Sequence, residues 1–372
     1  MNKWSFPTQI YAGPDSLNRL TEFNNESILI ICDPFLKDSP SLTYVMGLMN
    51  SKNKVTIYTD VVPDPPITHV VKGIEFMEGI KPSVIIAIGG GSCIDMSKGI
   101  AYFGRKLKQM DIKSFIAVPT TSGTGSEVTS FAVLTDSETQ IKYPLVDDAV
   151  LPDEALLTPL FVKTSPPSVT AFSGMDVLVH ALEAYVATAA NNFTDALAQQ
   201  AIELVFEYLP KCHKPTAAEQ DRMSMHEASC LAGLSFNKAG LGIVHAMAHQ
   251  LGGQFHVPHG LANSMLLPYV IGFNCSRNQE VAKKYAHLSA KLGFASHKAS
   301  DGDKLGALLE AIVKLQRTLE CPMTLTEFGV DKATSESKLN LMADRALEDM
   351  CYRFNPYPAN HEDLIGLYKK VL

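Results

Sequence analysis

The chain has 372 residues, of which 46% are hydrophobic and 19% charged, and its formal net charge is −7. This composition is typical of a globular protein with a large interior, and the length favours two domains. The acidic balance and the lack of a Lys- or Arg-rich run argue against nucleic acid as a partner. No segment is apolar over the length of a bilayer and the first residues carry no signal-peptide pattern, so we expect a cytoplasmic protein without a membrane role.

Strands and helices alternate in the first half of the chain. Four short apolar runs lack strict alternation, which predicts strands buried on both faces, as in a parallel sheet. These runs are Ser27–Cys32, Lys54–Tyr58, Ser83–Ile88 and Ser114–Val118. Residues 67–80 have helical periodicity between two of them. We therefore predict a Rossmann-like α/β domain with a doubly wound parallel sheet.

The second half of the chain has the pattern of helices alone. After Pro159 the apolar residues recur with a period near 3.6, and three prolines between residues 159 and 167 interrupt helix formation. Helices are expected over Phe193–Leu209, Lys304–Leu319 and Ser335–Cys351. We place the domain boundary at the prolines and predict an α/β domain over residues 1–163 and an all-helical domain over residues 164–372.

A glycine turn follows the third predicted strand. Gly89, Gly90, Gly91 and Ser92 lead directly into a predicted helix. Glycines let backbone N–H groups approach an anion closely, and the helix N-terminus adds partial positive charge, so this turn suits a pyrophosphate. An ordinary strand-to-helix turn would have the same sequence, and the turn alone does not decide between the two.

A second loop, Pro119–Thr129, leaves the next strand and carries five hydroxyl side chains between residues 120 and 126. Two ligand-type loops at the carboxyl ends of strands match the way open α/β sheets bind ligands. Asp33 ends the first predicted strand, where an acid accepts hydrogen bonds from ribose hydroxyls and repels a 2′-phosphate, which favours NAD over NADP. The alternative is a turn residue before Pro34, and the Gly-x-Gly-x-x-Gly fingerprint is absent after this strand.

Candidate metal ligands lie in the helical half. Asp176 and His180 are four residues apart and therefore share one helix face. Their apolar neighbours indicate a buried helix, which argues against a surface ion pair. His245 and His259 add imidazoles from a later histidine-rich stretch, whereas His256 is a weaker candidate on ligand count. One carboxylate with three imidazoles suits Fe²⁺ or Zn²⁺.

Four motifs together resemble the iron-containing (group III) alcohol dehydrogenases over essentially the whole chain. They are Gly89–Lys98, Pro119–Ser126, Gly174–Tyr185 and the stretch from Gly240 to His259 that ends in Pro-His-Gly. Within that family, the length and the segments Ile141–Pro144 and His249–His256 look most like the short 1-propanol dehydrogenases of propanediol-utilisation operons.

The resemblance implies a dinucleotide-binding first domain and a metal- and substrate-binding second domain. The implied ligands of Fe²⁺, with Zn²⁺ as the alternative, are Asp176, His180, His245 and His259. The implied contacts of NAD(H) are the glycine turn for the pyrophosphate, Asp95, Thr120, Thr121 and Thr124 on the nicotinamide side, and Lys142 as a cofactor-facing lysine. His249 would be the histidine near the substrate that does not bind the metal, and it is the candidate proton relay.

The expected reaction is hydride transfer between the nicotinamide and a short-chain primary alcohol or aldehyde, such as 1-propanol or propanal. Family members are often dimers, so a homodimer is expected. Location within a bacterial microcompartment would depend on a partner such as an aldehyde dehydrogenase, because no separate address is visible at the N-terminus. 

Three other functions remain open at this point. A polyol such as glycerol could be the substrate. A lyase like dehydroquinate synthase would need a polar, basic pocket, whereas the second half is rich in Ala, Leu, Met and Gly. A non-catalytic metal- and nucleotide-binding scaffold would bind cofactor without turnover.

Overall fold

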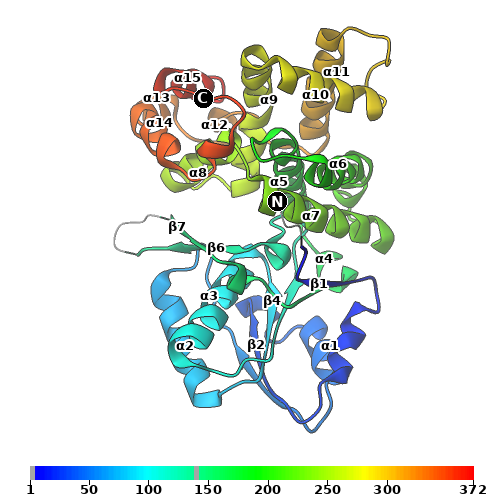
Figure 1. Ribbon diagram of the computed structural model, residues 1–372, viewed down its shortest axis with the longest axis vertical. Helices are drawn as coiled ribbons and strands as arrows, with labels where there is room; N and C mark the ends of the chain where they lie inside the picture. The colour runs from blue at the N-terminus through cyan, green and yellow to red at the C-terminus, as the bar shows by residue number, and fades with distance from the viewer. Residues whose placement is uncertain (1–4, 138–141) are drawn as a thin grey trace. The chain divides into compact units, whose positions relative to one another are not determined.

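The computed structural model describes residues 5–137 and 142–372, and the chain divides into two compact units, Met1–Ser165 and Pro166–Leu372 (Figure 1). A six-stranded sheet, in the order β1-β8-β5-β4-β2-β3, forms the centre of the first unit. Every pair of neighbouring strands in it is parallel. The strands are β1 (Gln9–Ala12), β2 (Ser27–Cys32), β3 (Lys54–Tyr58), β4 (Val84–Gly89), β5 (Ser114–Pro119) and β8 (Glu154–Leu157).

Helices cover both faces of this sheet. Leu29 and Ile31 of β2 join a buried cluster with α2 (Ile67–Ile80) and α3 (Gly91–Lys108). Ile28 and Ile30 point the other way, toward α1 (Pro40–Leu48), which lies on the opposite side of the sheet in Figure 1. Because both faces are buried, the central strands need continuous apolar runs, and the predicted parallel α/β sheet is confirmed.

The sequence did not reveal two short strands, the edge strand β1 and its neighbour β8, or a hairpin. Strands β1 and β8 have only four residues each, and β1 is largely exposed, so neither forms a long apolar run. Strands β6 (Phe131–Thr135) and β7 (Lys142–Val146) pair in antiparallel fashion. The mostly exposed residues of β7 include Pro144, which weakens a strand pattern. Ile141, in the segment 141–144, lies outside the described residues.

The second unit contains helices and, over residues 166–372, no strand. Its central helix, α5 (Pro167–Val186), is buried without interruption from Gly174 to Val186. The other long helices are α6 (Asn192–Cys212), α7 (Glu219–Ala239), α8 (Ile243–Phe255), α9 (His259–Arg277), α10 (Gln279–Lys291) and α11 (Asp301–Thr318). The prediction of a helical second half is confirmed.

One predicted helix was wrong in its extent. Instead of a single helix over Ser335–Cys351, the chain forms α13 (Lys332–Glu336) and α14 (Leu339–Glu348). The hydroxyls of Ser335 and Ser337 donate to the carbonyls of Lys332 and Thr334, at 2.9 and 2.7 Å. Such local bonds compete with helix continuation, and they explain the break. Because α14 ends at Glu348, Asp349 and Cys351 lie in a turn.

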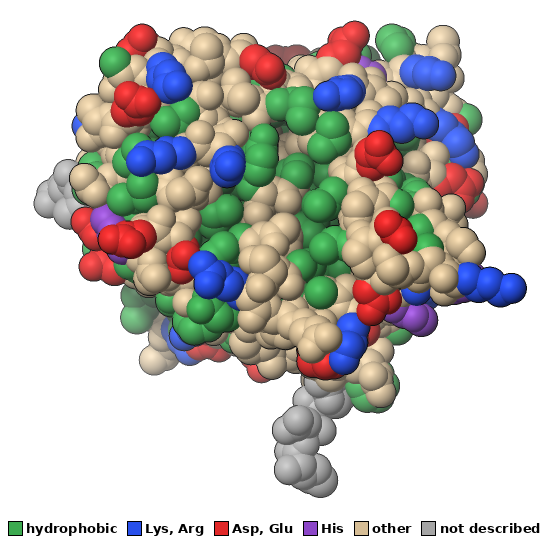
Figure 2. Space-filling view, turned by 90° about the horizontal axis from the view of Figure 1, so that it is seen from above, with side chains coloured by type: hydrophobic (Ala, Val, Ile, Leu, Met, Phe, Trp, Pro, Cys, Tyr) green, Lys and Arg blue, Asp and Glu red, His purple; other side chains and the backbone are tan. Residues whose placement is uncertain are grey.

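The charges on the surface are distributed as the sequence, which has no Lys- or Arg-rich run, leads one to expect. On the face drawn in Figure 2, lysines and arginines are interspersed with acidic side chains and do not gather into one basic patch. Among the described residues, none of the helices combines the length and the apolar character that a bilayer crossing requires.

Candidate functional site

Three helices of the second unit gather the four candidate metal ligands. Asp176 and His180 lie on α5, His245 on α8, and His259 is the first residue of α9. One donor atom from each lies within 4.8 Å of the other three. Asp176 Oδ1 is 3.7 Å from His245 Nε2 and 3.6 Å from His259 Nε2, and Asp176 Oδ2 is 4.0 Å from His180 Nε2. The spacing leaves room for one cation among the donors.

A glycine allows α9 to begin against α5. A Cβ atom at Gly260 would lie only 2.0 Å from the carbonyl oxygen of Phe172 on α5. Only glycine fits this approach, which brings the neighbouring His259 to Asp176. The Pro-His-Gly motif therefore supplies both a candidate metal ligand, His259, and a glycine that lets the two helices pack closely.

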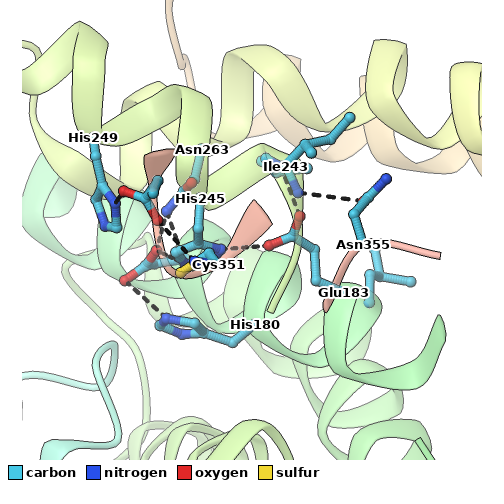
Figure 3. A network of polar contacts seen from close by, with 12 residues as sticks. His180, Glu183, Ile243, His245, His249, Asn263, Cys351 and Asn355 are labelled. Atoms are coloured by element: carbon cyan, nitrogen blue, oxygen red, sulfur yellow. Dashed lines mark hydrogen bonds and ion pairs between the residues drawn. The ribbon is translucent and has the colours of Figure 1, made fainter. Parts of the chain in front are cut away.

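Glu183 on α5 holds both His245 and the start of α8 (Figure 3). Its Oε2 lies 2.6 Å from His245 Nδ1, and its Oε1 accepts the N–H of Val244 at 2.7 Å. Asn355 Oδ1 accepts the N–H of Ile243 at 3.3 Å. Residue 242, which precedes the helix, is a glycine with no side chain to cap it. The two acceptors from elsewhere in the unit satisfy these N–H groups.

Aromatic stacking orders the histidine rings. His180 lies between Phe236 and His245, with ring-centroid distances of 4.4 and 4.6 Å and interplanar angles of 24° and 18°. Fixed ring planes keep the donor nitrogens in place, since rotation would break both stacks. The role of Phe236 has no signature in the sequence.

Asn263 was also missed. Its Nδ2 donates to Asp176 Oδ1 at 2.7 Å and lies 3.1 Å from both His245 Nε2 and His259 Nε2 (Figure 3). Its Oδ1 is buried and has no hydrogen-bond partner among the described residues. Asn263 follows His259 by four positions and so shares its helix face, a spacing that could have identified it.

The donor set is suited to a divalent cation. Burial opposes ionisation of Asp176, but the nearby imidazoles hold the pKa of its carboxyl below the ordinary range. Although 41% of the His259 side chain is exposed, partial loss of hydration and the neighbouring imidazoles lower its pKa, which favours the neutral ring. Burial also acts to lower the pKa of His245. Its hydrogen bonds with Asp176 and Glu183 outweigh this effect and raise the pKa to about 9. A bound cation would replace the His245 proton, as metal binding at imidazoles generally does.

His249 lies beside these donors but outside the group of four. It follows His245 by one turn of α8, and its ring stacks on His259 at a centroid distance of 5.4 Å. Its Nδ1 is 2.7 Å from Asp349 Oδ2. His256 follows α8 with a left-handed backbone. Among the described residues it belongs neither to the group of four nor to a second group of potential metal ligands, His249, Asp349 and Cys351.

The two predicted cofactor loops are neighbours in the first unit. Gly89 ends β4, and Gly90 precedes the first residue of α3. The N–H of Thr120 donates to the carbonyl of Gly89 at 3.0 Å. A Cβ atom at Gly91 would lie 2.6 Å from Thr124 Cγ2, and one at Gly90 would lie 3.7 Å from Thr121. The glycine turn and the hydroxyl loop thus form one continuous surface.

Two carboxylates, those of Asp33 and Asp95, make hydrogen bonds to this surface. Asp33 Oδ2 accepts the N–H of Gly90 at 3.2 Å. Asp95 accepts from Ser126 Oγ at 2.5 Å and from the N–H of Val133 at 2.9 Å, so its carboxylate supports the hydroxyl loop from α3. 

Lys142 reaches the glycine turn through an intermediate residue. Its Nζ lies 2.6 Å from Asp64 Oδ1, and the N–H of Asp64 donates to Ser92 Oγ at 3.3 Å. All the predicted cofactor residues therefore lie in or next to the two loops.

Comparison with known proteins gives family matches to both units. A model of the iron-containing alcohol dehydrogenases matches residues 7–159, and a model of the C-terminal part of the Fe-containing alcohol dehydrogenase family matches residues 170–372. The 1-propanol dehydrogenase PduQ of Salmonella typhimurium is 44% identical, with all of both chains covered. The NADPH-dependent butanol dehydrogenase of Clostridium saccharobutylicum is 37% identical, covering 100% of this chain and 98% of that protein.

Longer relatives and solved structures agree. The bifunctional aldehyde-alcohol dehydrogenase AdhE of Escherichia coli is 35% identical over 96% of this chain and 44% of its own length. The fold matches a 1,3-propanediol oxidoreductase with a TM-score of 0.91, 32% identity and full coverage of both chains. It also matches the sulfoacetaldehyde reductase of Bifidobacterium kashiwanohense in complex with NAD⁺, with a TM-score of 0.85, 26% identity and coverage of 100% and 98%. The chain therefore belongs to the iron-containing alcohol dehydrogenase family, as its four motifs predicted, and is an oxidoreductase.

Proposed function

We propose that the protein is an Fe²⁺- and NAD(H)-dependent dehydrogenase that interconverts short-chain primary alcohols and aldehydes, with 1-propanol and propanal as representative substrates. The observation that carries this proposal is the group of four donor atoms within 4.8 Å of one another, in a chain 44% identical over its full length to a 1-propanol dehydrogenase.

Asp176, His180, His245 and His259 would hold the ion. When bound, a divalent ion supplies Lewis-acid stabilisation of negative charge on the substrate oxygen. Fe²⁺ is the metal named by the family, and Zn²⁺ is the alternative, because both accept imidazole and carboxylate ligands. The hydrogen bonds of Glu183 and Asn263 support the geometry of this set.

The first domain, residues 1–163, would bind NAD(H), and the second, residues 164–372, would bind the metal and the substrate. Gly89, Gly90, Gly91 and Ser92 would surround the pyrophosphate at the start of α3. Thr120, Thr121 and Thr124 would line the nicotinamide side together with Asp95, whose bonds to the hydroxyl loop support that loop. Asp33 would accept bonds from the ribose, and Lys142 would face the cofactor.

His249 would carry the substrate proton. Its ring stacks on His259 next to the donor set, and it is free to exchange a proton because it is not one of the four donors. A small, weakly polar substrate fits the Ala-, Leu- and Met-rich helices of this unit better than a polyol does.

We further propose that the protein forms a homodimer. We also propose an aldehyde dehydrogenase as a partner, since the aldehyde that one enzyme produces is the substrate of the other. The name of AdhE joins the two activities in one protein, and this chain spans 44% of it. The similarity to PduQ, together with the resemblance to the dehydrogenases of propanediol-utilisation operons, supports our proposal of a location in the cytoplasm within a microcompartment.

The test begins with anaerobic purification and elemental analysis, followed by assays of two- to four-carbon aldehydes and glycerol with NADH and with NADPH. We expect one iron per chain and NADH-dependent reduction of propanal. In His259→Ala, bound iron and activity should disappear together, because one of four donors is lost. Full activity of this variant without metal would overturn the proposal, as would NADH binding without turnover of any substrate in the wild type.

A further inference from the structure

His249 makes a polar contact with a residue 100 positions later in the chain. Its Nδ1 lies 2.7 Å from Asp349 Oδ2. Asp349 directly follows α14, which packs against α8 in the same unit. The pair is partly shielded, because only 26% of the His249 side chain and 13% of the Asp349 side chain are exposed. Solvent screening is therefore weaker here than for a surface ion pair.

The backbone of the turn holds the other carboxylate oxygen of Asp349. Its Oδ1 accepts the N–H of Cys351 at 2.9 Å (Figure 3 labels His249 and Cys351). Burial acts to raise the pKa of Asp349, but each of its oxygens meets a partner, His249 Nδ1 or the Cys351 N–H, and these contacts lower the pKa and favour the carboxylate. An ionised carboxylate only accepts hydrogen bonds, so His249 Nδ1 must carry the hydrogen. In the neutral ring, Nε2 is then the nitrogen with the free lone pair.

The plane of the His249 ring is also fixed. It stacks on the His259 ring with an interplanar angle of 16°, and it lies edge-on to His245 at a centroid distance of 6.2 Å. A change of rotamer would break both the stack and the Asp349 bond.

We propose that Asp349 is a positioning residue that holds His249 as the Nδ1–H tautomer, so that Nε2 accepts the substrate proton. This inference rests on the proposed role of His249. In alcohol oxidation the O–H bond would break and its proton would go to Nε2, while the C–H bond of the carbon that bears this oxygen would break and its hydride would pass to the bound cofactor, NAD⁺. The imidazolium keeps its Nδ1–H on Asp349, whose negative charge stabilises it, and the proton returns in the reverse reaction.

The same residues could instead hold a cation. His249, Asp349 and Cys351 each offer one ligand atom, and these atoms lie within 4.8 Å of one another. However, burial and the nearby Asp349 charge raise the pKa of the Cys351 thiol well above its ordinary value. A protonated thiol is a poor ligand, because thiolate is the form that binds metals. The hydrogen-bonded arrangement is therefore favoured, and a cation is an outcome of the test.

The test uses the metal-loaded enzyme with Asp349→Asn. The Cys351 N–H needs the amide oxygen, so the amide nitrogen would face His249 Nδ1 and favour the Nε2–H tautomer. We expect kcat to fall by about 10- to 100-fold, the usual loss when a supporting hydrogen-bond partner is removed. Bound metal, NADH affinity and the KM of the alcohol should stay as in the wild type. In zinc-loaded protein labelled with ¹⁵N-histidine, the hydrogen of His249 should move from Nδ1 to Nε2.

Two controls make the result specific. Asp344→Asn removes a carboxylate of α14, five residues before Asp349, that contacts His361 at 3.2 Å on the surface, and it should leave kcat unchanged. Adding Asp349→Asn to His249→Phe should cause no further loss of kcat, because the two act as one unit.

Three results would overturn the inference: an unchanged kcat with Nδ1–H retained, a further loss in the double variant, or a second bound metal that Asp349→Asn removes. If the wild type oxidises no alcohol, the proposed function fails, and the ¹⁵N spectrum still reports whether Asp349 sets the tautomer.

Discussion

Glu183 Oε2 lies 2.6 Å from His245 Nδ1, and the same carboxylate accepts the N–H of Val244 through its other oxygen. One side chain on α5 thus sets both the first turn of α8 and the ring that this turn carries. His249, one turn later, is held by Asp349 through the same ring nitrogen. On both histidines a carboxylate lies at Nδ1, which leaves Nε2 for the proposed metal on His245 and for the proposed proton transfer on His249.

Replacing Glu183 with Gln should weaken metal binding. The amide must present either its oxygen or its nitrogen to His245 and cannot neutralise charge, so the ring is held less firmly. We expect the affinity for Zn²⁺ to fall by about 10- to 100-fold, as for other residues that orient a ligand. Competition against a chromophoric chelator measures this affinity. Glu207→Gln on α6, which is exposed, is the control. Equal affinity in both variants would show that Glu183 acts only on the start of α8.

Gly90→Ala separates cofactor contact from local folding. Its backbone angles, φ −73° and ψ −175°, are open to alanine, and the nearest atom to the added Cβ would be 3.7 Å away. The fold should therefore persist, while a methyl group at the turn would obstruct the pyrophosphate. We expect the Kd of NADH to rise by about tenfold, which is 1.4 kcal/mol. Fluorescence titration measures it. Gly79→Ala on α2, where the added Cβ meets nothing within 4 Å, is the control.

An unchanged Kd in Gly90→Ala would mean that the turn does not approach the cofactor. Gly91→Ala would not discriminate, because its Cβ would collide with Thr124 at 2.6 Å and disturb the loop itself.

Asp33→Asn should relax the preference for NADH. The amide oxygen can still accept the Gly90 N–H, but the negative charge that repels a 2′-phosphate is gone. We expect the ratio of kcat/KM for NADPH to that for NADH to rise by about tenfold, or 1.4 kcal/mol. Steady-state assays with both cofactors give this ratio. Asp38→Asn, an exposed residue nearby, should leave it unchanged. If Asp33→Asn also left this ratio unchanged, Asp33 would be only a turn residue.

The four candidate ligands could be chosen from the sequence because helical spacing and residue chemistry are local properties. Asp176 and His180 share a face wherever their helix packs, and imidazoles with a carboxylate suit the proposed ion. The residue that would position the proposed proton relay could not be chosen in this way. Asp349 is 100 positions from His249, and its use depends on the unforeseen end of α14.

The fold shows the same division between local and tertiary signals. Strand β2 and helix α2 were predicted at their observed bounds because their patterns are complete within each segment. Strand β8 was missed, since its four residues begin with a buried glutamate whose charge is met by Arg19 at 2.7 Å. Only the folded chain brings that arginine to it.

A buried lysine supports the hydroxyl loop and a buried glutamate lies within this loop, and the two give the first unit a pH dependence of its own. Lys98 Nζ donates to Thr129 Oγ1 at 3.0 Å and to the carbonyl of Phe131 at 2.8 Å, and it lies 3.8 Å from Asp95. Burial lowers its pKa to about 8. Glu127, 2% exposed, is buried in the same region, and burial raises its pKa to about 7 although Lys98 opposes the shift.

Glu127→Gln should remove one part of this dependence. The folded protein holds the Glu127 proton more tightly than the unfolded chain, whose carboxyl has the ordinary pKa of 4.5. The Glu127 contribution therefore destabilises the fold progressively as pH rises from about 4.5 through about 7, by up to about 1.4 kcal/mol per pH unit. The pH dependence of stability that Lys98 contributes lies above about pH 8 and has the opposite sign, because burial lowers its pKa from 10.5 to about 8. Relative to the wild type, the Tm of Glu127→Gln should increase by about 2–4 °C per pH unit between pH 5 and 7 and then level off.

Calorimetry of both proteins across this range provides the measurement. Glu78→Gln, which removes an exposed partner of Lys108, should track the wild type at every pH. If the difference in Tm between Glu127→Gln and the wild type were the same at pH 5 and pH 7, Glu127 would be ionised in the fold throughout. Lys98 would then form a true ion pair with it, and the hydroxyl loop would depend on that charge instead of on the bonds from Lys98 to Thr129 and Phe131.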